Sequence, residues 1–165
     1  MPESAVETVR PGDATGAERI EREGERYRTV LLPTDGSQGA SRGIRRGLEL
    51  ADAHGATVHV LHVIDESTEG ETPALSSEEL ALEALEEEAA DLLDEVANEA
   101  SELGLEAVTK CVRGDPCEEI RKYAADADVD LIVMGVHGTR AGARPHFGGT
   151  TERVVRTADV PVLTV

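Results

Sequence analysis

Aromatic side chains are almost absent from this sequence of 165 residues. There is no tryptophan, and the aromatic residues are Tyr27, Tyr123 and Phe147. Lysine is equally scarce, occurring only as Lys110 and Lys122, while the formal net charge is -18. A surface of that charge repels nucleic acid phosphates and anionic lipids, and so few rings offer no stacking platform for single strands. The composition therefore argues against nucleic acid and membrane surfaces as partners.

The shortage of lysine coincides with an excess of acidic side chains, 34 against 16 basic ones. Acid-rich, lysine-poor surfaces suit a salt-rich cytoplasm, because short screening lengths relieve the repulsion between like charges. We therefore take a halophilic source as a hypothesis. The alternative is a mutational bias towards arginine codons in an ordinary acidic protein.

Cysteines and long apolar runs are scarce as well. Cys111 and Cys117 are the two cysteines, and because nothing else indicates an oxidising compartment, we interpret both as reduced thiols. No stretch is long and apolar enough to span a membrane, and the first ten residues lack the apolar core of a signal peptide. These absences lead us to expect a cytoplasmic protein.

Apolar patterning divides the chain into two regions. Residues 1–26 are polar and lack periodicity, which predicts a disordered acidic tail. Residues 27–165 suit a single domain with a sizeable core. Strands are expected at 28–33, 57–64, 106–112, 130–134 and 160–165, and helices at 38–54, 76–103, 117–127 and 150–158. This alternation predicts an α/β fold with a mainly parallel sheet.

Two of the expected helices have distinct apolar faces. The helix at 38–54 places four apolar residues on one side, at Ala40, Ile44, Leu48 and Ala51. Gly43 and Gly47 would let it approach the sheet closely, and Ser37 or Asp35 can cap it. The longer helix repeats apolar residues at helical spacing, at Leu85, Leu92, Val96 and Leu103.

Candidate binding residues gather at one edge of the expected sheet, because ligands bind beyond the carboxyl ends of parallel strands. The loops expected there are Pro33-Thr34-Asp35, Val63-Ile64-Asp65 and a glycine-rich loop from Gly135 to Gly149. A nucleotide suits this set. Backbone N–H groups of the glycine loop and of the following helix start would hold phosphates, and the hydroxyls of Thr150 and Thr151 could donate to them.

Side chains of other kinds complete such a site. Arg140 and Arg144 would add positive charge, while Val63 and Met134 would supply apolar faces for a base. Asp35 could accept from the amino group of adenine or help to hold a magnesium ion.

Each of these features also has a simpler interpretation. Asp35 can be only a helix cap, and a glycine loop without the lysine of a P-loop is a weak signal. His59 and His62 lie in a strand and are expected at its core or rim. His137 and His146 lack metal-ligand spacing, so we assign no metal. No nucleophile and base can be paired from the sequence, so we assign no catalytic residues.

Four segments carry a resemblance to a known family. They are VLLPTDGS (30–37), VLHVIDE (60–66), VRGDP (112–116) and the segment from MGVHG to PVLTV (134–165). From Tyr27 to Val165 the chain resembles the universal stress proteins. The resemblance implies a Rossmann-like, five-stranded parallel sheet of order 3-2-1-4-5 between helices, and a homodimer.

The resemblance also bears on the glycine loop. The family's nucleotide-binding members carry Gly, two residues, Gly, nine residues, and then Gly followed by Ser or Thr. Here Gly135 and Gly138 match, and the run TRAGARPHF leads to Gly148. Gly149 then stands where the family has a hydroxyl. An alternative register, with Gly149-Thr150 and one inserted residue, restores it.

By resemblance, a nucleotide would lie among eleven positions. The base and ribose would contact Pro33, Asp35, Val63 and Met134, with Thr34 in the same loop. The phosphates would contact Gly135, Gly138, Gly148, Gly149, Thr150 and Thr151. The expected ligand is ATP or a related adenine nucleotide, with or without Mg²⁺.

The resemblance leaves two functions open. The first is a stress-response regulatory protein that binds an adenine nucleotide, and the second is a nucleotide-free dimeric interaction protein. An enzyme such as a slow ATPase ranks below both, because no general base or activated nucleophile is evident. In either case we expect a homodimer through Val160 to Val165, an edge strand that has no charged side chain to block pairing.

Overall fold

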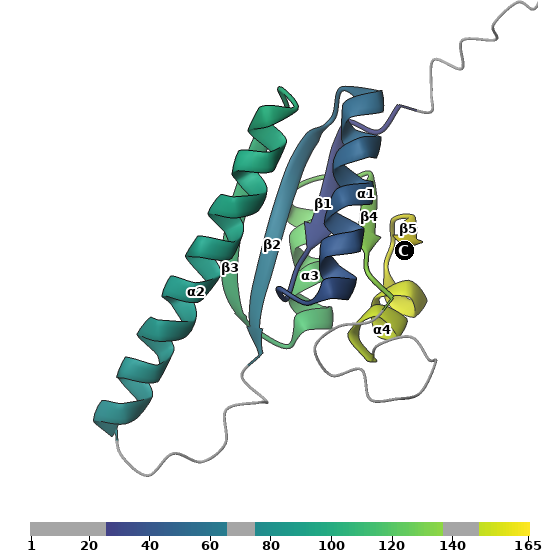
Figure 1. The fold of residues 1–165 in the computed structure, drawn as a ribbon. Helices are drawn as coiled ribbons and strands as arrows, with labels where there is room; N and C mark the ends of the chain where they lie inside the picture. Colours follow the sequence, from purple (N-terminus) through teal and green to yellow (C-terminus); the bar gives the residue numbers. More distant parts are fainter. Residues whose placement is uncertain (1–25, 66–74, 137–148) are drawn as a thin grey trace, which may run out of the picture.

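The computed structural model describes residues 26–65, 75–136 and 149–165, with the side chains of 75–78 excepted. The predicted tail, residues 1–26, lies outside this part of the chain apart from Arg26. Helices and strands alternate throughout the described residues (Figure 1). In chain order they are β1 (Thr29–Pro33), α1 (Gln38–His54), β2 (Thr57–Asp65), α2 (Leu75–Glu102), β3 (Ala107–Gly114), α3 (Pro116–Asp126), β4 (Leu131–Met134), α4 (Gly149–Thr157) and β5 (Val162–Thr164).

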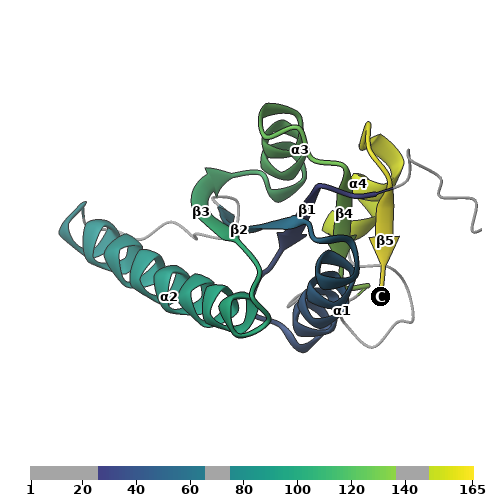
Figure 2. The ribbon, with the colours of Figure 1, turned by 90° about the horizontal axis from the view of Figure 1, so that it is seen from above.

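The five strands form one parallel sheet with the order β3-β2-β1-β4-β5, which confirms the predicted fold. Side chains alternate between the two faces of each strand, so the sheet has two cores. Val30, Leu32, Val58 and Val60 pack against α1 and α2, while Leu31, Leu61 and Ile132 pack against α3 and α4. Figure 2 shows the two helix layers on either side of the sheet. The near-continuous apolar strands follow from this double coverage.

Helix α1 lies against the sheet as its sequence predicts. Its four expected core residues are all buried, at Ala40, Ile44, Leu48 and Ala51. A Cβ on Gly43 would stand 2.7 Å from the backbone nitrogen of Gly135, and one on Gly47 would stand 2.1 Å from Cδ2 of Leu32. Both distances are below 3.0 Å, which real Cβ atoms essentially never show. The neighbour of Gly43 is backbone, so this glycine sets the distance between helix and sheet, while Gly47 leaves room for the buried side chain of Leu32.

The predicted apolar face of α2 is wrong in part. The buried residues of α2 are Ala89, Leu93, Val96 and Ala100. Leu85 and Leu103 are instead 36% and 49% exposed. At about 100° per residue, the buried set is centred about 50° around the helix from the line through Leu85, Leu92, Val96 and Leu103. The two alanines account for the rotation, because small side chains let the helix approach the sheet where leucines would hold it away.

Candidate functional site

The loop after β1 is built by its own side chains. Thr34 is buried, its N–H donates to the Leu61 carbonyl at 2.9 Å, and its Oγ1 accepts from the N–H of Gly36 at 3.2 Å. Oδ1 of Asp35 accepts from the N–H of Ser37 at 3.0 Å. Oγ of Ser37 then accepts from the N–H of Ala40 at 3.1 Å and caps α1. Ser37 is therefore the N-cap residue, and the interpretation of Asp35 as that cap is wrong.

His62 holds this loop from the neighbouring strand. Its Nδ1 lies 2.9 Å from the carbonyl oxygen of Thr34, so Nδ1 carries a proton and donates it. His59, three residues earlier, contacts the hydroxyl of Tyr123 on α3 at 2.8 Å, and burial lowers the pKa of His59. The sequence predicted histidines in the core or at the rim, and only the structure shows that one of them positions the loop that carries Asp35.

Apolar residues expected beside a base share one face of the sheet. Met134, 6% exposed, and the half-buried Val63 both belong to the core covered by α3 and α4. Pro33 follows Leu31 by two residues and so points to the same face. All three lie at the carboxyl ends of their strands. The structure thus gathers Pro33, Val63 and Met134 on one side of the edge where the loops leave the sheet.

Gly135 is required by the packing of the backbone. A Cβ there would stand 2.1 Å from the carbonyl oxygen of Gly39 and 2.8 Å from the nitrogen of Ala40. The chain therefore leaves β4 directly beneath the first turn of α1, and only glycine fits at the crossing. The sequence suggested a ligand as the reason for this glycine, but the contact between α1 and β4 is a sufficient reason by itself.

The start of α4 is fixed at the same crossing. Thr151 is 5% exposed, and its Oγ1 donates to the Gly135 carbonyl at 2.9 Å. Val154, one turn later, is fully buried against the face that carries Met134. The hydroxyl proton of Thr151 is therefore engaged within the protein. What α4 offers to a ligand is its first N–H groups, which have no partner within the helix and lie at its positive end.

Gly149, the first residue of α4, is exposed and has space around it. A Cβ at this position would meet no atom of the described residues within 4 Å. Thr150, next to it, is half-buried. The predicted phosphate contacts Gly138 and Gly148, together with Arg140, Arg144, His137 and His146, lie outside the described residues. The described half of the site thus consists of the β1 loop, the crossing at Gly135 and the start of α4.

An ion pair that the sequence analysis missed joins α4 to the turn before α3. Arg153 donates from NH1 to Oδ2 of Asp115 at 2.8 Å, and the other carboxylate oxygen caps α3 by accepting from the N–H of Glu118 at 3.0 Å. The hydrogen bond from Arg153 is the main reason that the pKa of Asp115 lies below its usual value, followed by the backbone hydrogen bond. The two partners are separated by 38 positions in the sequence, and this spacing left no signal of their contact.

Replacing Arg153 by glutamine is expected to raise the pKa of Asp115 towards the ordinary aspartate value. In the native protein the Asp115 carboxylate adds stability above that ordinary pKa, and the contribution is lost as the pH falls through the lower folded value. A ¹³C NMR titration of the Asp115 carboxyl carbon between about pH 2 and pH 6 measures the shift. Arg156→Gln is the control, because Arg156 pairs with Glu152 on the same helix. If both variants raise the pKa equally, the direct contact is not its cause.

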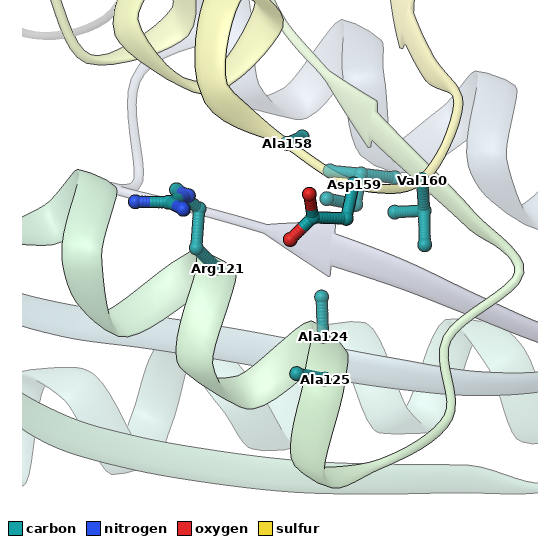
Figure 3. A pocket seen from close by; sticks show the side chains of 7 residues that line it. Arg121, Ala124, Ala125, Ala158, Asp159 and Val160 are labelled. Atoms are coloured by element: carbon teal, nitrogen blue, oxygen red, sulfur yellow. The ribbon is translucent and has the colours of Figure 1, made fainter.

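Two other features of the described residues offer no competing site. One cluster has ligand atoms close enough together to suggest a metal, and it consists of Asp115, Cys117 and Glu118. The guanidinium of Arg153 already pairs with the carboxylate of Asp115, however, and would repel a cation. A hollow of about 40 Å³ lies between α3 and the connection from α4 to β5, with Arg121 and Asp159 on its walls (Figure 3). It has room for a few water molecules and not for a nucleotide.

A comparison with known proteins decides the family. The model of the universal stress protein family matches residues 26–165. The chain belongs to the universal stress protein family. Universal stress protein MJ0531 of Methanocaldococcus jannaschii is 36% identical over 147 residues, which cover 88% of this chain and 86% of the relative.

Solved structures of universal stress proteins share the fold. UspA from Lactobacillus plantarum superposes with a TM-score of 0.78 at 29% identity, over 85% of this chain and 98% of the other. The protein MJ0577 superposes with a TM-score of 0.74 at 33% identity, over 84% and 95% respectively. No helix in the described part of this universal stress protein is long and apolar enough to cross a membrane.

Proposed function

We propose that this universal stress protein is a stress-response regulator that binds ATP or a related adenine nucleotide at the carboxyl edge of its sheet. The observation that carries the proposal is the hydrogen bond from Thr151 to Gly135, which holds the positive end of α4 at the exit of β4. The exposed carboxylate of Asp35 and the apolar residues Val63 and Met134 stand at the ends of neighbouring strands.

The chemistry of the described residues fits such a ligand. The open space at Gly149 and the first N–H groups of α4 suit phosphate oxygens, which are held by backbone donors at helix starts elsewhere. Val63 and Met134 suit the apolar faces of a base, and the carboxylate of Asp35 suits an amino or hydroxyl donor. Pro33, Thr34, Thr150 and the loop residues Gly138 and Gly148 complete the proposed set. Mg²⁺ would bind through the phosphates and Asp35.

Relatives with the same fold support the ligand class. One universal stress protein has been solved in complex with cAMP, and one from Archaeoglobus fulgidus in complex with dAMP, at TM-scores of 0.64 and 0.59. Their identities of 23% and 22% support the shared fold, and the extension of an adenine nucleotide to this chain is our proposal.

Calorimetric titration of the full chain with Mg-ATP, and separately with AMP and GTP, tests the proposal. We expect saturable heat with the adenine nucleotides and a weaker response to GTP. The absence of heat up to about millimolar ligand, measured in high salt, would reject binding, because a Kd above this corresponds to a binding free energy of less than about 4 kcal/mol. Mass spectrometry of the denatured protein gives an independent answer, because a copurified nucleotide would contradict the nucleotide-free alternative.

That alternative, a nucleotide-free dimeric interaction protein, is favoured by one specific observation. Gly135 is explained by its contact with Gly39, and the position of Gly149 carries no hydroxyl. Gly135 would therefore persist in a member that had lost its ligand. Titration separates the two functions, since both predict the same fold.

We also propose that the protein is a homodimer that pairs through β5. This strand is at the edge of the sheet, and Leu163 is 36% exposed. The N–H of Ile132 donates to the carbonyl of Pro161, and the N–H of Val165 donates to the carbonyl of Met134. The backbone N–H and C=O groups of the odd-numbered residues along this segment therefore point towards β4. The N–H and C=O groups of Val162 and Thr164 therefore face outwards, where a second copy could pair with them.

Thr164→Pro is expected to convert such a dimer to a monomer without unfolding the sheet, because it removes an outward N–H only. Leu163→Pro is the matched control, since it removes an inward N–H and should lower stability instead. Sedimentation velocity and a thermal melt of both variants measure the two effects. A Thr164→Pro variant that remains dimeric would contradict pairing through β5.

Stability is expected to rise when salt is raised from about 0.1 M to molar concentration, if the acidic surface reflects a halophilic source. Screening relieves repulsion among carboxylates that outnumber basic groups two to one, by 34 to 16. Urea melts across a series of KCl concentrations measure the free energy of unfolding. A flat or falling trend would favour the alternative of codon bias in an ordinary acidic protein.

A further inference from the structure

The first turns of α2 extend beyond the end of the sheet. The helix has 28 residues and α1 has 17, so α2 is longer by about 16 Å at 1.5 Å per residue. Figures 1 and 2 both show its first turns continuing past the end of β2 and away from α1. Among the described side chains of α2, residues 79–102, the buried ones lie from Ala89 onward, and none of residues 79–88 is buried.

An apolar stripe nevertheless continues along this extension, which we call the α2 overhang (residues 79–88). Leu82 and Leu85 precede the buried Ala89 by seven and four residues, so they extend the buried stripe towards the start of the helix. Leu85 is 36% exposed, and Leu82 is half-buried. Leu80 is 67% exposed but lies about 200° from Leu82, on the opposite side of the helix. The stripe therefore reaches the end of the sheet, where Glu86 pairs with Arg113 of β3, and leaves Leu82 and Leu85 partly open to solvent.

The charge of the helix selects what could cover this stripe. Its sequence, LSSEELALEALEEEAADLLDEVANEASE, contains acidic residues throughout and no lysine, arginine or histidine. A second α2 laid against it would bring carboxylates against carboxylates, which disfavours self-association there. Residues 66–74, ESTEGETPA, are acidic and contain no leucine, isoleucine, valine or aromatic residue, so they do not complement the stripe either. The overhang already accepts one guanidinium, in the ion pair between Glu86 and Arg113 of β3.

We propose that the α2 overhang is a docking surface for a basic amphipathic helix of a partner protein. Apolar side chains of the partner would cover Leu82 and Leu85, and its lysines or arginines would pair with flanking carboxylates such as Glu79 and Glu83. Because the surface combines exposed leucines with carboxylates, the partner helix needs both an apolar face and positive charge. It is independent of nucleotide binding, since no residue of the proposed nucleotide site lies on α2.

Fluorescence anisotropy with labelled peptides tests the proposal on the full chain. The probe is an 18-residue helix of leucine and lysine with leucines at i, i+3, i+4 and i+7, and the comparison peptide has the same composition in an order without an apolar face. We expect the amphipathic probe to bind at least about tenfold more tightly. Equal binding of the two peptides would mean general attraction to an acidic protein and would overturn the proposal, as would the absence of binding.

Matched variants locate the binding surface on the helix. Leu82→Gln/Leu85→Gln should reduce affinity for the amphipathic probe to that for the comparison peptide, while Leu80→Gln should change it less than about twofold, because Leu80 lies on the other side. Circular dichroism checks that the helix is intact, and Leu85→Gln alone serves if the double variant unfolds. Equal losses in Leu80→Gln and Leu85→Gln would overturn the assignment. So would a dimer that dissociates on Leu85→Gln, because the stripe would then bind a second copy.

Discussion

Gly135→Ala is expected to destabilise the domain by at least about 3 kcal/mol, the upper end of the usual cost of overpacking. The new Cβ would stand 2.1 Å from the carbonyl oxygen of Gly39 and 2.8 Å from the nitrogen of Ala40. Both neighbours are backbone atoms, which no side-chain rotation can move. Relief requires a shift of α1 or of the exit from β4. A loss of this size is a large share of the 5–15 kcal/mol that stabilises a typical domain.

Urea unfolding at a fixed salt concentration, without nucleotide, measures this effect. Gly149→Ala is the control, because its Cβ meets no atom of the described residues within 4 Å and alanine favours a helix. We expect the control to unfold at or above the native midpoint. If Gly135→Ala were as stable as the native protein, then packing would not explain this glycine, and the ligand would again be its best explanation.

Gly149→Ser is expected to tighten binding of Mg-ATP by about ten- to a hundredfold. The added hydroxyl restores a donor to a phosphate oxygen, and a hydrogen bond to a charged group contributes about 1.5–3 kcal/mol. The structure has room for the side chain at the exposed start of α4. Calorimetric titration measures the change in affinity. An unchanged affinity would favour the register in which Thr150 already supplies the hydroxyl.

Gly149→Asp separates binding from folding at the same position. A carboxylate at the positive end of a helix stabilises it by about 0.3–1 kcal/mol, while it repels phosphate. We therefore expect a melting temperature equal to or above the native value, together with the loss of nucleotide binding. Opposite effects of Ser and Asp on affinity would identify α4 as the phosphate site, whereas equal affinities in all three proteins would exclude it.

The elements of this fold could be predicted from the sequence because each leaves a local pattern. The face of α1 was correct because Ala40, Ile44, Leu48 and Ala51 recur at helical spacing, and the alternation of helices and strands indicated a parallel sheet. The order of the strands is not a local property, and it came from the family resemblance. The face of α2 was partly wrong because leucines dominate a sequence pattern while alanines decide how closely a helix can pack.

The contacts among the candidate residues could not be predicted from the sequence, although their place at one edge of the sheet could. The sequence brought Asp35, Met134 and Gly135 to one edge, since strands of a parallel sheet end together. It could not decide between Ser37 and Asp35 as the cap of α1, nor show that His62 holds the loop from β2 or that Arg153 reaches Asp115. These contacts depend on which residues lie close together in the folded chain, and the spacing of residues in the sequence does not indicate that.

The hydrogen bond from Val136 to the carbonyl of Val165, at 2.9 Å, has a thermodynamic consequence. Val136 follows the crossing at Gly135, and Val165 follows directly on β5, so this hydrogen bond joins the exit of β4 to the edge of the sheet. If nucleotide binds at this crossing and a second copy pairs along β5, the two equilibria are linked. Nucleotide would then change the dimer dissociation constant, and dimerisation would change nucleotide affinity by the same coupling free energy.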